Sequence, residues 1–208
     1  MNRREILRYT AVATGAALSA PFATAFLTGC QAEPAVEPYL PEFFSQEEYD
    51  FILRFADIII PRTDTPGASD VGVPQTIDKM VGVVFNAESQ EEARMGIQLL
   101  RERIDEDTPE GGFMALDDEA ALAHLTAVDN HFKDPATATA INTMEEGEAQ
   151  DIARAKMDTY FQLKGMVIAN YFGSKEVATT QLAYLPVPGE YIPCGDLQEL
   201  TGGKAWAL

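Results

Sequence analysis

His124 and His131 are the only histidines in the sequence, and histidine is the side chain most often used for metal binding and acid-base catalysis. They lie seven positions apart, which places them on one face of a helix but two turns from each other. Two turns are too far for both imidazoles to bind one metal ion without further ligands. Asp117, Asp118 and Asp129 lie nearby, but a solvated acidic helix face explains these carboxylates more simply. We therefore expect this chain to bind no metal and no cofactor.

Other catalytic signatures are missing from the sequence. It contains no Gly-rich phosphate loop, no C-x-x-C-H haem site and no H-E-x-x-H zinc motif. No histidine lies near Ser69 or Ser174 in the sequence. Because a catalytic triad is assembled in space, a hydrolase that uses His124 or His131 stays open as an alternative. The main expectation is a protein that is not an enzyme.

The chain is strongly acidic, with a formal net charge of −18 at pH 7. Nucleic-acid binding needs Lys and Arg to displace counterions from phosphates, so we exclude nucleic acid as a partner. The negative charge serves either solubility alone or the attraction of a basic partner such as a c-type cytochrome. The only cysteines are Cys30 and Cys194, too few for a disulfide framework.

Residues 1–29 resemble a twin-arginine export signal. Arg3 and Arg4 precede an apolar pair, and the stretch from Tyr9 to Phe26 is uncharged but only weakly apolar. The following Leu-Thr-Gly-Cys sequence resembles a lipobox that ends at Cys30. We therefore expect a mature chain that begins at Cys30 and is lipid-anchored on the periplasmic side of the membrane. The twin-arginine route carries folded proteins, and because this chain lacks a cofactor motif, the signal suggests a passenger protein.

The mature chain is predicted to be a tether followed by one all-α domain. Residues 30–41 are rich in Pro and Glu, which is typical of an extended tether, and the domain occupies residues 42–208. Apolar residues at helical spacing, with capping residues and prolines, predict a small irregular bundle of about five helices. These helices run from a capping box at Ser45–Glu48 to about Ile59, from Pro74 to Val84, from a capping box at Ser89–Glu92 to Ile104, from a cap at Asp117 to about Phe132, and from Glu148 to Phe172.

An extended C-terminal arm is predicted from about residue 174. The stretch Tyr184–Pro193 is apolar, aromatic and rich in Pro, which cannot continue a helix. Exposed apolar patches typically mark protein interfaces, but the arm could equally fold back over its own core. If Cys30 carries lipid, Cys194 is left either to bridge to a partner or to be buried as a small hydrophobic residue.

Two blocks, Ile59–Ala68 and Tyr184–Tyr191, resemble the gluconate 2-dehydrogenase subunit 3 family. Two further stretches between these blocks, Val73–Asp78 and Phe161–Ser174, also resemble the family and occur in the same order as in it. The resemblance implies a small non-catalytic subunit of a membrane-associated dehydrogenase that oxidises sugars, sugar acids or polyols. It also implies that FAD lies in a large GMC-type flavoprotein subunit and that a cytochrome c subunit with haem c is a third component in some complexes.

The resemblance further implies that this chain carries the folded flavoprotein through export and stabilises or tethers it. The lipobox departs from the plainer signal of the family, which leaves open whether the cytochrome holds the complex at the membrane. The alternative is a free-standing periplasmic lipoprotein or a chaperone for another partner. Cys194 is the candidate for an intersubunit disulfide. The residues predicted to contact the partner are Ile60, Pro61, Arg62, Asp64, Pro66, Gly67, Tyr184, Pro186, Pro188, Gly189 and Tyr191.

Overall fold

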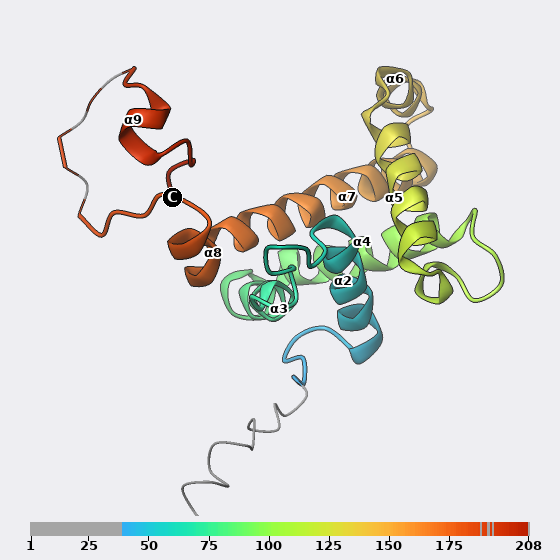
Figure 1. The fold of residues 1–208 in the computed structure, drawn as a ribbon. Coiled ribbons are helices and arrows are strands. Elements are labelled where there is room, and N and C mark those ends of the chain that lie inside the picture. The colour runs from blue at the N-terminus through green and yellow to red at the C-terminus, as the bar shows by residue number, and fades with distance from the viewer. Residues whose placement is uncertain (1–38, 188, 191, 193, 208) are drawn as a thin grey trace, which may run out of the picture. The chain divides into compact units, whose positions relative to one another are not determined.

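Helices make up the regular structure in the part of the chain that the computed structural model describes, residues 39–187, 189–190, 192 and 194–207 (Figure 1). The helices are α2 (Gln46–Ile59), α3 (Val73–Val84), α4 (Ala87–Asp105), the 3-10 turn η1 (Phe113–Ala115), α5 (Asp118–Lys133), α6 (Pro135–Thr143), α7 (Glu148–Gly173), α8 (Lys175–Thr180) and α9 (Leu197–Thr201). The all-α fold class is confirmed. Residues 40–208 group into one compact unit by their contacts. The predicted export signal, with Arg3, Arg4 and Cys30, lies outside the described residues.

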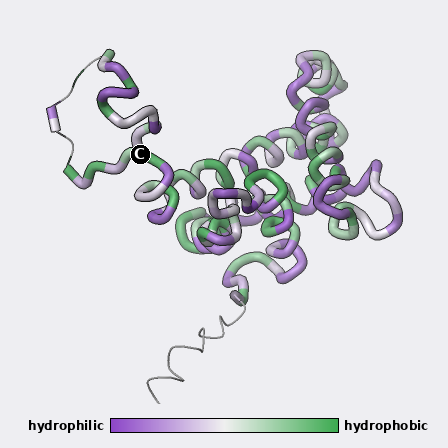
Figure 2. Tube along the Cα trace, viewed as in Figure 1, coloured by the Kyte–Doolittle hydropathy of each residue, from purple (hydrophilic) through white to green (hydrophobic). Residues whose placement is uncertain are grey.

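Helix α2 begins where the capping box predicted. The Ser45 hydroxyl accepts from the Glu48 amide, and the Glu48 carboxylate accepts from the Ser45 amide at 2.8 Å. Two apolar stripes along the helix predict burial on two sides, and Phe51, Ile52 and Phe55 are all buried. Figure 2 shows that hydrophobic and hydrophilic residues alternate along the helices, as amphipathic packing requires.

Helix α4 begins two residues before the capping box predicted at Ser89–Glu92. Asn86 is the N-cap, and its side-chain oxygen accepts from the Ser89 amide at 2.9 Å. Ser89 therefore lies inside the helix, because Asn caps a helix at least as well as Ser does. Gln90 has another role, since its amide group donates to the carbonyls of Val81 and Phe85 at 3.2 Å and so caps the end of α3.

Helix α6 was not predicted. The sequence Lys133-Asp134-Pro135 predicts the end of the helix capped by Asp117, and α5 does end at Lys133. The Asp134 side chain, however, accepts from the Ala136 amide and caps a new helix with Pro135 in its first turn. Proline is favoured at that position because its missing N–H has no helical partner there in any case.

Helix α7 is the central element of the domain and contacts α2, α3, α4, α6 and α8. Tyr160, on this helix, packs edge-to-face on Phe55, with ring centroids 5.9 Å apart, and also against Phe132. A Cβ at Gly96 of α4 would overlap the Thr159 hydroxyl, so this glycine lets α4 and α7 approach closely. The long C-terminal helix of the sequence prediction is thus the element on which the core is built.

Two carboxylates, one fully buried and one partly buried, join separate segments of the domain through hydrogen bonds. The fully buried Asp78 carboxylate accepts from the backbone amides of Glu42, Phe43 and Phe44 at 2.7, 3.1 and 2.9 Å. These bonds fix the segment that leads into α2 against α3. Burial of Tyr49, together with the nearby negative charge of Asp78, raises the pKa of the Tyr49 hydroxyl to about 12.

The second carboxylate, Asp129 of α5, joins α5 to α7. It accepts from the Tyr160 hydroxyl at 2.9 Å and from the Lys164 ammonium at 2.5 Å, and it pairs with Lys133 at 2.6 Å. Burial alone would raise the pKa of Asp129, but the hydrogen bonds from Lys133, Lys164 and Tyr160 outweigh it and lower the pKa to about 2. Asp129 therefore acts as a charged cross-link between helices.

The segment after α7 is partly helical rather than an irregular arm throughout. Ser174 ends α7 and its hydroxyl accepts from the Val177 amide, which caps the short helix α8. The sequence pattern predicted an arm from about residue 174, but the extended part begins only after Thr180. The stop predicted at Gly173 was correct, and what it missed was a cap that starts a new helix in the next residue.

Candidate partner-binding surface

The loop between α2 and α3, residues 60–72, is closed by an ion pair. The Arg62 guanidinium binds the Asp70 carboxylate through two nitrogens, with Nε 2.6 Å from Oδ2. The same Oδ2 accepts from the Gly67 amide at 2.8 Å. The hydrogen bond from Arg62, followed by that from Gly67, lowers the pKa of Asp70 below its ordinary value. A Cβ at Gly67 would lie 2.8 Å from the backbone nitrogen of Arg62, so the loop needs glycine there.

The loop is also fixed to the helices beneath it. The Ala68 amide donates to the Ile60 carbonyl at 2.9 Å and closes the base of the loop. The Tyr171 hydroxyl, near the end of α7, donates to the Pro66 carbonyl at 2.8 Å. The loop therefore holds a defined conformation while its tip stays exposed to solvent, including Pro61, Arg62 and Asp64.

The C-terminal arm forms a second exposed feature. Ala183 donates to the Ala205 carbonyl at 2.8 Å and accepts from the Ala207 amide at 2.9 Å, which closes residues 183–207 into a loop that contains α9. Several of its large apolar side chains are about half exposed or more, namely Tyr184, Leu185, Val187, Ile192, Leu197 and Trp206. This exposure favours the interface interpretation of the arm over an arm that is folded onto the core.

Cys194 lies in this arm as an exposed free thiol. The alternative that it is buried as a small hydrophobic residue is therefore wrong. Its φ of 56° places it in the left-handed region, which is uncommon for a residue with a side chain. The bridge to a partner remains a prediction.

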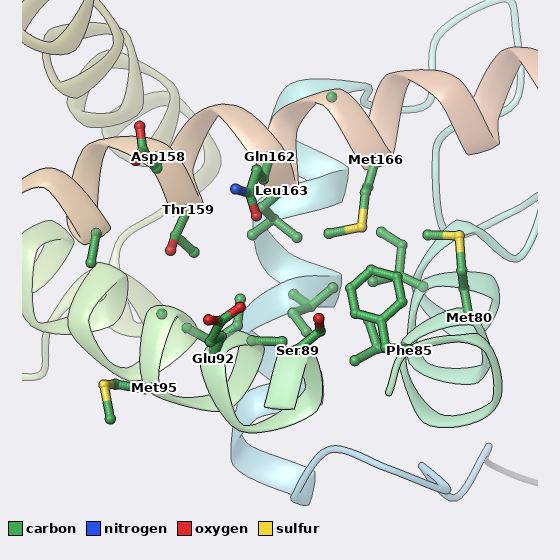
Figure 3. A pocket seen from close by; sticks show the side chains of 18 of the residues that line it. Met80, Phe85, Ser89, Glu92, Met95, Asp158, Thr159, Gln162, Leu163 and Met166 are labelled. Carbon is green, nitrogen blue, oxygen red and sulfur yellow. The ribbon is translucent and has the colours of Figure 1, made fainter. Parts of the chain in front are cut away.

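A long apolar groove runs between α3, α4 and α7, with a volume of about 920 Å³ (Figure 3). Its apolar end is formed by Met80, Phe85 and Met166, and the side chains of Glu92 and Asp158 lie toward its other end (Figure 3). No sequence pattern predicted this groove, because its apolar residues come from four helices, α2, α3, α4 and α7, and each helix taken alone shows ordinary core spacing.

Each of the two histidines contacts a neighbouring group of the fold. His124 Nε2 donates to the Ile104 carbonyl at 2.6 Å, and the ring of His131 packs beside Phe132. Asp117 caps α5, as predicted. Among the described residues, no group of three or more His, Cys, Asp or Glu side chains could hold a metal ion. No helix in this part of the chain is both long and apolar enough to span a bilayer.

The sequence of the chain matches one known protein family. A family model described as gluconate 2-dehydrogenase subunit 3 matches residues 46–189, which is well over half of the sequence. The chain belongs to the gluconate 2-dehydrogenase subunit 3 family. Membership implies a subunit that associates with the other subunits of a dehydrogenase complex. No curated protein and no solved structure matches the chain.

The gluconate 2-dehydrogenase subunit 3 match begins with α2 and ends in the arm. It includes both blocks of predicted contact residues as far as Gly189, and it stops before Cys194. Six of these residues lie in the α2–α3 loop, namely Ile60, Pro61, Arg62, Asp64, Pro66 and Gly67. Tyr184, Pro186 and Gly189 are exposed in the arm, whereas Pro188 and Tyr191 lie outside the described residues.

The end of α7 connects the two blocks in this family member. Tyr171 holds the loop, and Ser174 caps the helix that leads into the arm. Among the described residues, no hydrogen bond or ion pair joins the loop to the arm directly. Loop and arm are therefore two separate exposed features, each attached to the same end of one helix.

Proposed function

We propose that this chain is the non-catalytic small subunit of a membrane-associated, FAD-dependent dehydrogenase that oxidises sugars, sugar acids or polyols. The observation that carries the proposal is membership of the gluconate 2-dehydrogenase subunit 3 family across the helical domain. In the proposed complex, FAD and the reacting groups belong to a large GMC-type flavoprotein subunit. A cytochrome c subunit would accept its electrons.

The α2–α3 loop and the C-terminal arm are the proposed contacts with the flavoprotein. The loop supports this role because its conformation is fixed before binding by the Arg62–Asp70 pair and by Tyr171. A preorganised loop loses little conformational entropy when it docks. The arm supports it because Tyr184 and Leu185 are 51% and 52% exposed, and aromatic side chains of this kind are frequent anchors at interfaces.

Export of the flavoprotein is the second part of the proposal. Arg3 and Arg4 would direct the chain and its folded partner to the twin-arginine route, and the lipid on Cys30 would hold the complex on the periplasmic face of the membrane. The mature chain would then begin directly at its membrane anchor.

The test is co-expression of the flavoprotein subunit with this chain, followed by fractionation. With the wild-type chain, the flavoprotein and its activity should appear together in the periplasmic membrane fraction. With Arg3→Lys and Arg4→Lys combined, both proteins should stay in the cytoplasm. With Cys30→Ala, both should be exported but released from the membrane. A flavoprotein that is exported and active in the absence of this chain would refute the proposal.

A bridge through Cys194 is a separate part of the proposal. Its exposure leaves the thiol free to react with a cysteine of the flavoprotein in an oxidising compartment. A nonreducing gel of the purified complex should show a band at the summed mass that disappears on reduction. The Cys194→Ser variant should lack that band, and a wild-type complex without it would remove this part of the proposal.

A further inference from the structure

None of the predicted contact residues of the loop or the arm lines the groove between α3, α4 and α7, and nothing in the proposed function uses it. Its wall on α7 is one helical face, whose charged residues all lie in the N-terminal half of the wall. Along α7 this face contains Ala155, Asp158, Gln162, Gly165, Met166 and Ala169. Gly165 and Ala169 are exposed, so a second helix can approach the α7 backbone closely there.

The length of the groove favours a polypeptide over a small molecule. Its α7 wall extends from Asp151 to Asn170, and at about 1.5 Å per residue this stretch is roughly 28 Å long. A length of roughly 28 Å matches about five turns of helix, whereas drug-sized ligands are buried in more enclosed pockets. The apolar end of the groove, formed by Met80, Phe85 and Met166, suits an apolar helix face, because methionine side chains adapt to irregular surfaces.

The charges on the rim define the chemistry of the occupant. Glu92 on α4 and Asp151 and Asp158 on α7 are exposed, and none of their carboxylates forms an ion pair with another described residue. Arg154 is the one basic residue among those that line the groove. An occupant with Lys or Arg along its edges would complement this rim.

The groove also adjoins the proposed contact surface. Its last α7 residues, Ala169 and Asn170, directly precede Tyr171, which holds the α2–α3 loop. The groove therefore ends one residue before the side chain that holds the loop, and a single partner could contact both.

We propose that the groove binds a helix of the dehydrogenase subunit that has an apolar face and basic residues along its edges. This inference rests on the proposed function, since it names a second contact between the same two subunits. The helix would lay its apolar face over Met80, Phe85 and Met166 and place its basic side chains beside Glu92 and Asp158.

A steric test uses Gly165→Leu. A Cβ at Gly165 would meet no atom within 4 Å, so the leucine projects into the groove without disturbing the fold. Leucine also favours helix more than glycine does, which keeps the domain stable. We expect the full-length chain with this change to bind the purified dehydrogenase subunit at least tenfold more weakly, on the order of a central interface substitution. Ala123→Leu, at an exposed position of α5, is the matched control and should bind like the wild type.

An electrostatic test uses Glu92→Lys combined with Asp158→Lys. We expect the association to weaken by roughly threefold to tenfold at low salt and the difference to shrink as salt is added. The control is Glu110→Lys, an exposed loop position outside the groove, which changes the net charge by the same amount per residue. Circular dichroism of all variants confirms that the helical domain is intact.

The outcomes separate this inference from the proposed function. If the wild-type chain binds the dehydrogenase subunit but the groove variants bind equally well, the groove assignment is wrong and the proposed function stands. If the wild-type chain does not bind that subunit, both are wrong. If the isolated chain is a dimer that Gly165→Leu dissociates, the occupant is a second copy of the chain and the assignment to the partner is overturned.

Discussion

The Asp78 carboxylate should be among the most important single groups for the stability of the domain. It is fully buried and accepts from three consecutive backbone amides, those of Glu42, Phe43 and Phe44. Replacement by alanine removes these bonds and leaves the amides without their acceptor. The segment that leads into α2 would then lose these three hydrogen bonds to α3.

The magnitude follows from the surroundings of the three amides. A hydrogen bond to a charged group contributes about 1.5–3 kcal/mol, and a buried donor without a partner costs about 1–3 kcal/mol. The bond from Phe44 is buried, whereas the Glu42 and Phe43 amides are only partly buried and can turn to water. Removing the charge also relieves the desolvation of a buried ion, which offsets part of the loss. The net expectation for Asp78→Ala is a destabilisation of about 3 kcal/mol.

The assay is urea unfolding of the full-length chain, followed by circular dichroism. With a slope of about 2 kcal/mol per molar urea, the midpoint of Asp78→Ala should fall by about 1.5 M. Native-state hydrogen exchange should show faster exchange at the amides of residues 42–44 than at those of α7. Asp64→Ala, at an exposed loop position, is the control and should unfold like the wild type. A loss below about 1 kcal/mol for Asp78→Ala would refute the reasoning, because it would mean that the three amides can hydrogen-bond to water instead at little cost.

Three further predictions concern the loop and the cross-link between α5 and α7. Tyr171→Phe removes the bond to the Pro66 carbonyl and should cost about 1 kcal/mol in urea unfolding, with faster proteolysis of the loop; unchanged proteolysis would contradict the anchoring role. Gly67→Ala should destabilise the chain, because the added Cβ would press on the Arg62 backbone. Gly173→Ala is the control and should not destabilise the chain, because there is open space around Gly173. Equal melting temperatures of the two variants would disprove the steric argument. The pKa of Asp129 is lowered to about 2, so its stabilising contribution should be complete above about pH 4 and lost as the pH falls toward 2. Asp129→Asn should flatten this part of the stability profile, and a profile with the wild-type slope would show that other carboxylates cause it.

The local signals in the sequence predicted the main helices well, because caps and apolar spacing act within a few residues. Ser45 and Asp117 cap the helices that were expected to begin there. The errors came from residues with two possible roles. Asn86 displaced Ser89 as a cap, and Asp134 began a helix where the pattern of Lys133 to Pro135 suggested only an end.

The partner-binding surface was predicted only where it is continuous in sequence. The α2–α3 loop is one segment dense in turn-forming residues, so composition predicted an ordered loop, although not the Arg62–Asp70 pair that closes it. The buried role of Asp78 depends on a segment more than thirty positions earlier in the chain, and no local pattern reveals it. Its position between inward-facing Ile77 and Val81 was the one available signal, since an acidic residue in an apolar stripe needs a partner.

The central position of α7 has a consequence for the timing of synthesis. This helix contacts α2, α3 and α4, which precede it in the chain, so those helices have no complete core to pack against until Gly173 has been made. At about 5–20 residues per second, the roughly 140 residues between Cys30 and Gly173 take about 7–30 s to synthesise. Arg3 and Arg4 are therefore present on the ribosome for that whole interval before the domain can fold. If the chain uses the proposed twin-arginine route, which carries folded proteins, that route has to tolerate this delay, and α7 is the element that ends it.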